Sequence, residues 1–116
     1  MILAWLGAFL VGQAIEVPVY ALALRRRRPR LASRLLLAFA PTALTHPIVW
    51  FVFPRLFTDD RYWTMVLLAE LFAVAVEAIV VRLAGLEWRL AVAASLAANG
   101  ASVALGLAGR QLFGWP

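Results

Sequence analysis

The chain has 116 residues, of which 65% are hydrophobic and 15% are charged, and its formal net charge is +5. A soluble domain would be roughly half apolar and about one quarter charged. The excess of apolar residues occurs in long runs, which indicates an all-α integral membrane protein. The absence of cysteine excludes disulfides, thiolate catalysis and cysteine-ligated metal sites.

Four apolar runs follow one another along the chain, and each has about the 20 residues that cross the hydrocarbon core. The first run lacks the basic start and small-residue cleavage site of a secretory signal, so it is interpreted as a retained helix. Because the connections are short, consecutive helices should be antiparallel neighbours. We predict a single domain over residues 1–116, a compact four-transmembrane-helix bundle with helices at about 2–24, 35–57, 62–82 and 89–109.

The loops differ in arginine content, and this difference predicts the orientation in the membrane. The first loop, residues 25–34, is strongly basic, and the third contributes Arg82 and Arg89, whereas the second is charge-balanced. The positive-inside rule therefore predicts that loops one and three are cytoplasmic and that both termini lie outside. Eleven arginines without a lysine are typical of a GC-rich genome. We expect a multi-pass protein of a bacterial-type inner (plasma) membrane.

The arginine-rich loop also predicts a partner. Such segments bind nucleic acid in some proteins and anionic lipid head groups in others. Because this one directly follows a membrane helix, we expect the segment Arg25–Arg34 to contact the bilayer's anionic head groups and no nucleic acid.

Polar side chains interrupt the apolar runs at similar depths. Counting about 1.5 Å per residue from the basic ends, most of them fall near the middle of a hydrocarbon core about 30 Å thick. A charged side chain facing lipid at that depth costs roughly 3 kcal/mol. We therefore expect these residues to face one another and to form an ion-binding site. The candidates are Gln13, Glu16, Thr45, His46, Glu70, Glu77, Asn99 and Ser102.

Helical spacing agrees with a shared interior. Residues three, four or seven apart lie on one face of a helix. Each helix that follows this pattern has one polar face for the interior and an apolar face for lipid. The spacing relates Gln13, Glu16 and Tyr20 in the first helix, Glu70 and Glu77 in the third, and Ser95, Asn99 and Ser102 in the fourth.

Three prolines, Pro18, Pro41 and Pro47, lie within the first two predicted helices. Each lacks an amide hydrogen and leaves the carbonyl four residues earlier without its partner. We expect the first and second helices to be broken there, and broken helices beside ionisable groups such as Glu16 and His46 are typical of transport sites. The alternative is that prolines are simply frequent in membrane helices.

The three glutamates must be protonated, paired or bound to a cation, because no arginine or lysine lies at their depth. His46, Glu16 and Glu70 would suit a divalent metal ion, which is the one cofactor that these residue types suggest. However, no H-E-x-x-H, E-x-x-H or paired-histidine motif is present. No nucleophile or phosphate-loop motif indicates an enzyme, although a glutamate–histidine pair could act as acid and base.

The size, the four predicted helices and the pair Glu16-Val17 in the first helix resemble the small multidrug resistance transporters. The glycine-rich third-helix motif of that family is absent here, and Glu70 and Glu77 occupy that helix instead. The chain is therefore not assigned to the family. The resemblance implies only that a chain of this size can transport when it dimerises.

Two functional hypotheses follow. The first is a transporter or channel for protons or small cations, divalent ions included, that acts as a homo-oligomer because one four-helix bundle has little room for an aqueous path. The second is a non-catalytic membrane scaffold or accessory subunit of a larger complex, whose buried polar residues fix helix packing. Three acids exceed what packing requires, which favours the first hypothesis.

Overall fold

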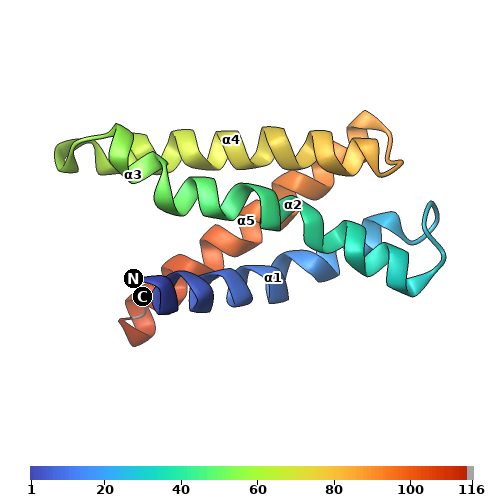
Figure 1. Cartoon of the computed structure of the whole chain (residues 1–116), viewed down its shortest axis with the longest axis horizontal. Helices are drawn as coiled ribbons and strands as arrows, with labels where there is room; N and C mark the ends of the chain where they lie inside the picture. Colours follow the sequence, from blue (N-terminus) through green and yellow to red (C-terminus); the bar gives the residue numbers. More distant parts are fainter. Residues whose placement is uncertain (115–116) are drawn as a thin grey trace.

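The computed structural model describes residues 1–114, and within that range the fold is all-helical without strands (Figure 1). Its elements are α1 (Ile2–Leu24), α2 (Leu31–Phe51), the short α3 (Phe53–Leu56), the 3-10 turn η1 (Asp59–Arg61), α4 (Tyr62–Leu83) and α5 (Trp88–Phe113). Four stretches are long and apolar enough to cross a membrane, namely Ile2–Leu24, Leu31–Leu56, Asp59–Leu83 and Trp88–Phe113. The predicted all-helical class with four candidate spans is confirmed.

The second span differs most from its prediction, because it begins earlier and consists of two helices. Arg30 has an extended backbone and precedes the first turn of α2, so that helix begins at Leu31. Pro54 lies in the first turn of α3, where its missing amide hydrogen removes no hydrogen bond. At the other end of the chain, α5 runs to Phe113 and ends at Gly114, whose positive φ of 65° suits a glycine.

The predicted proline breaks are not seen. α1 continues through Pro18, and α2 continues through Pro41 and Pro47. A proline removes one hydrogen bond of the helix, whereas ending the helix in an apolar environment would leave several backbone groups unpaired. The three prolines therefore give no support for a transport site.

The four long helices form a closed ring in cross-section. α1 packs against α2 and α5, and α4 packs against the same two helices. Figure 1 shows both termini together at one end, with the α1–α2 and α4–α5 connections at the opposite end. The molecule measures 44 × 25 × 22 Å. Its long axis matches a bilayer of about 40–45 Å including the head-group regions.

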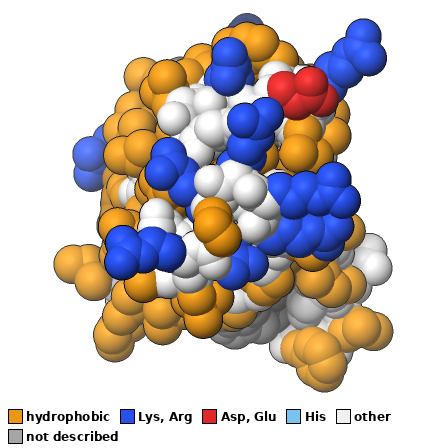
Figure 2. Space-filling view, turned by 90° about the vertical axis from the view of Figure 1, so that its right-hand side faces the viewer, with side chains coloured by type: hydrophobic (Ala, Val, Ile, Leu, Met, Phe, Trp, Pro, Cys, Tyr) orange, Lys and Arg blue, Asp and Glu red, His pale blue; other side chains and the backbone are white. Residues whose placement is uncertain are grey.

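Arginines gather at the end that carries these two connections, here called the basic end (Figure 2). The two loops are tied to each other, because Arg28 Nε donates a hydrogen bond of 3.0 Å to the Ala84 carbonyl. Arg82 donates a further bond of 3.1 Å to the Leu86 carbonyl. The two arginine-rich loops thus share one end, as the predicted topology requires, while the side of the membrane that this end faces stays a prediction.

The interior is built from small side chains, and the large ones face outward. Several alanines of the core, including Ala38, Ala91 and Ala98, are completely buried, which lets the helices approach closely. Leu83 and Phe113, by contrast, are 80% and 82% exposed at the surface. The buried apolar cluster, called the apolar layer below, comprises Tyr20, Leu24, Ala38, Val81, Ala84, Leu86, Ala91, Ala94 and Ala98.

Candidate functional site: a carboxyl network and its cavity

The carboxyl group of Glu77 in α4 lies where all four long helices meet, and only 1% of the residue is exposed. It accepts hydrogen bonds from the Tyr20 hydroxyl of α1 and the Thr45 hydroxyl of α2, both at 2.5 Å. The Asn99 side-chain amide of α5 donates a third bond at 2.6 Å. One carboxyl group therefore connects the four spans. Tyr20, Thr45, Glu77 and Asn99 are called the Glu77 network.

Further bonds orient the donors of this network. The Asn99 amide nitrogen also donates to the Ser95 carbonyl at 3.0 Å, and the Ser95 hydroxyl donates to the Val74 carbonyl at 2.8 Å. The Thr45 hydroxyl has one hydrogen and two acceptors in reach, the Pro41 carbonyl and the much nearer Glu77 carboxylate. Burying a carboxyl group is costly unless hydrogen bonds satisfy it, and three donors do so here without a cationic partner.

A cavity of about 160 Å³ lies beside Glu77. Since liquid water occupies about 30 Å³ per molecule, the space would hold a few waters or one small hydrated ion. None of the lining residues is an arginine or a lysine. The lining consists of Glu16, Thr42, Thr45, His46, Val49, Glu70, Ala73, Glu77, Asn99, Ser102 and Val103.

The other two acids of the cavity have fewer partners than Glu77. Glu16 of α1 is 4% exposed and accepts a hydrogen bond from the Thr42 hydroxyl of α2. Glu70 of α4 is partly buried, and its carboxyl group makes no hydrogen bond within residues 1–114. Both carboxyl groups can therefore accept further hydrogen bonds, and both line the same cavity.

His46 lies between this cavity and a group of aromatic rings. Its ring is stacked on Trp50 with centroids 5.9 Å apart, meets Phe9 edge-on at 5.5 Å and lies 6.1 Å from Trp5. Its Nδ1 atom is buried without a hydrogen-bond partner. The imidazole thus borders the cavity, but it forms no hydrogen bond with a glutamate in the described part of the chain.

The structure brings most of the predicted site residues to one place and leaves one outside. Gln13 does not line the cavity; its amide donates at 3.1 Å to the Phe39 carbonyl and so links α1 to α2. Tyr20 and Thr42 were not among the predicted site residues. Helical spacing had placed Tyr20 on the polar face of Gln13 and Glu16 without naming it as a site residue, and Thr42 could have been found in the same way, because it precedes Thr45 by three residues.

The metal prediction does not match a ligand cluster. Glu16, His46 and Glu70 all line the cavity. Within residues 1–114, however, no group of three histidine, cysteine, aspartate or glutamate side chains is arranged to hold a metal ion.

Comparison of the chain with protein-family models, with curated proteins and with solved structures finds no match. A function can therefore be inferred only from the chemistry of the Glu77 network and its cavity, because fold alone does not determine function.

Proposed function

We propose that the chain is a small membrane transporter or channel for protons or small cations, and that the ion site is the cavity between Glu16 and Glu70. One observation carries this proposal: carboxyl groups from α1 and α4 and an imidazole from α2 border a single cavity without an arginine or lysine. Such a lining attracts cations and can take up and release protons.

Helix packing accounts for one acid of the cavity but not for all of them. Glu77 has three donors, so its carboxyl group is accounted for by helix association. Glu70 has no hydrogen-bond partner within residues 1–114, and an unpaired carboxyl group in an apolar environment costs free energy. A bound proton or cation would lower that cost, which supports an ion site at this position.

The apolar layer limits the path that an ion could take. Leu24 and Leu86 lie next to the loops of the basic end and are at most 1% exposed, and Tyr20 of the same layer is completely buried and bonded to Glu77. An ion that moves between the cavity and the basic end requires these side chains to separate, or a second copy of the chain to complete the path. We assign the basic end to the cytoplasmic side of a bacterial-type inner membrane by the positive-inside rule, and we propose a homo-oligomer.

Ion flux through reconstituted proteoliposomes tests the proposal. A pH-sensitive dye inside the vesicles reports proton entry under a potassium diffusion potential, and replacing external sodium reports cation selectivity. Glu16→Gln should lower the flux at least about tenfold, equivalent to about 1.4 kcal/mol in the barrier. Glu87→Gln is the matched control, because Glu87 is exposed in the α4–α5 loop. Unchanged flux in a correctly folded Glu16→Gln protein would contradict the proposal.

The Glu77 network favours a second candidate, a membrane scaffold or accessory subunit. One carboxyl group that is hydrogen-bonded to three other helices stabilises a single packing arrangement of the four. This candidate predicts that Asn99→Ala and His46→Ala lower thermal stability without a specific loss of flux. Purification of the chain from its native membrane in a stable hetero-complex would favour it over transport.

A further inference from the structure

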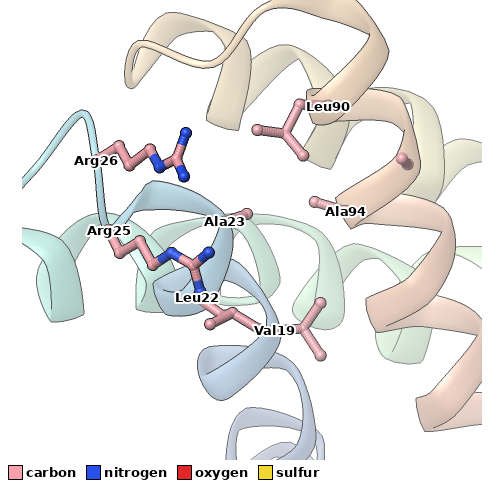
Figure 3. Close-up of a pocket in the computed structure, with 8 residues that line it drawn as sticks. Val19, Leu22, Ala23, Arg25, Arg26, Leu90 and Ala94 are labelled. Carbon is pink, nitrogen blue, oxygen red and sulfur yellow. The ribbon is translucent and has the colours of Figure 1, made fainter.

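A second hollow, which shares no lining residue with the polar cavity, lies between α1 and α5 at the basic end (Figure 3). Its volume of about 550 Å³ is within the range of about 300–1,000 Å³ that is usual for ligand sites. The hollow exists because the side chains of Ala93 and Ala94 on α5 are too small to fill the gap to α1. The lining residues are Val19, Leu22, Ala23, Arg25, Arg26, Leu90, Ala93 and Ala94.

This groove combines apolar walls with a cationic mouth. Figure 3 shows Leu22 and Val19 below the side chain of Arg25, with Leu90 and Ala94 across the gap on α5. Arg26 extends into the same gap. The groove contains no acidic residue. A ligand that is complementary to it is anionic at one end and apolar at the other.

The two arginines of the mouth are free to bind such a ligand, whereas others at this end are not. Arg28 and Arg82 donate to backbone carbonyls of the α4–α5 loop and hold it in place. The guanidinium groups of Arg25 and Arg26 make no hydrogen bond within residues 1–114. A neighbouring hollow of about 510 Å³ is also arginine-rich, but Glu87 lines it and would repel an anion.

We propose that this groove binds one anionic phospholipid, with its phosphate between Arg25 and Arg26 and the upper part of an acyl chain along Val19 and Leu90. Arginine suits phosphate because its planar guanidinium donates two parallel hydrogen bonds. The groove begins at the end of α1, where the head groups of a bilayer would lie. A free phosphate ion would leave the apolar walls exposed to water, so a lipid fits the groove better.

Lipid retention in native mass spectrometry tests this site independently of transport. The protein is purified in a neutral detergent and titrated with phosphatidylglycerol or with phosphatidylcholine of the same chains. Wild-type protein should retain one phosphatidylglycerol in preference to phosphatidylcholine. Arg25→Gln with Arg26→Gln should weaken this retention about thirtyfold, given about 1 kcal/mol for each of the two basic residues near a lipid surface.

Two further variants separate this site from general charge attraction. Arg27→Gln with Arg30→Gln removes the same charge from the same loop but leaves the groove lining intact, and should lower retention less than about threefold. Ala93→Phe fills the groove from its exposed rim with every charge kept, and should also lower retention. Equal losses in the two double variants would overturn the proposal, as would full retention in Ala93→Phe. Circular dichroism confirms that each variant is folded.

Discussion

Glu70 and Glu77 lie two helical turns apart on the same face of α4, yet their surroundings differ. Glu77 is 1% exposed and receives hydrogen bonds from three other helices. Glu70 is partly exposed toward the cavity and receives none within residues 1–114. The contrast shows that one helix face can serve two purposes. The turn nearer the basic end holds the helices together, and the turn nearer the termini presents a carboxyl group to an open space.

Glu16 lies between these two extremes. It is as deeply buried as a structural residue, but within residues 1–114 its one hydrogen bond comes from the Thr42 hydroxyl, and it faces the cavity. If the contrast on α4 is correct, substitutions at Glu77 should mainly change stability. Substitutions at Glu16 and Glu70 should mainly change ion flux.

The largest expected effect follows from removing the carboxyl group of the Glu77 network. Glu77→Ala removes the acceptor that Tyr20, Thr45 and Asn99 share, so three hydrogen bonds between helices are lost. Thr45 and Asn99 keep backbone carbonyls as acceptors, whereas the Tyr20 hydroxyl is left unsatisfied, and an unsatisfied buried donor costs about 1–3 kcal/mol. We expect a loss of at least about 3 kcal/mol, measured by thermal unfolding in detergent. Glu87→Ala, at an exposed position, serves as the control and should change stability by less than about 0.5 kcal/mol.

Glu70→Gln should have the opposite profile. The carboxyl group has no hydrogen-bond partner to lose, so stability should change by less than about 0.5 kcal/mol. Proton or cation flux in proteoliposomes should fall about tenfold, because the amide carries no charge and does not titrate. A destabilised protein with normal flux would show that Glu70 is a packing residue and would remove the contrast with Glu77.

Tyr20→Phe should have a moderate effect, since it removes a single donor and keeps the aromatic ring. Hydrogen bonds between membrane helices contribute about 0.6 kcal/mol on average and up to about 1.7 kcal/mol. We expect a loss in this range, measured by the same unfolding assay. Combined with Thr45→Val, the effects should be non-additive, because both hydroxyls donate to one carboxyl group. Strict additivity would indicate that the two bonds form independently.

The smallest change in stability is expected for His46→Phe. Phenylalanine retains the ring contacts with Trp50 and Phe9, and no hydrogen bond of the imidazole is lost. Thermal stability should therefore stay within about 0.5 kcal/mol of wild type. Flux separates the two roles of this position: reduced flux assigns the imidazole to the ion site, and normal flux assigns it to the aromatic group alone.

Hydropathy was sufficient to predict four apolar helices, and helical periodicity assigned a polar face to the first, third and fourth of them. These properties are local, because they depend on the spacing of residues within one helix and on the cost of exposing polar groups to lipid. The cost of exposing polar groups to lipid also predicted that Glu16, Glu70 and Asn99 face one another, and these three residues line one cavity in the structure. The helix breaks predicted at the prolines are not seen, because one missing hydrogen bond does not end an otherwise intact helix.

The choice of partners was decided only by the way in which the helices cross. Tyr20 and Glu77 are separated by 57 positions in the chain and belong to helices that are not neighbours in the ring, yet they form a direct hydrogen bond. Gln13 has the same spacing and depth as a site residue, but the rotation of α1 directs its amide to the Phe39 carbonyl. The depth of a side chain along its helix and the helix face on which it lies follow from the order of the amino acids. Which two faces come into contact depends on the rotation and crossing of the packed helices.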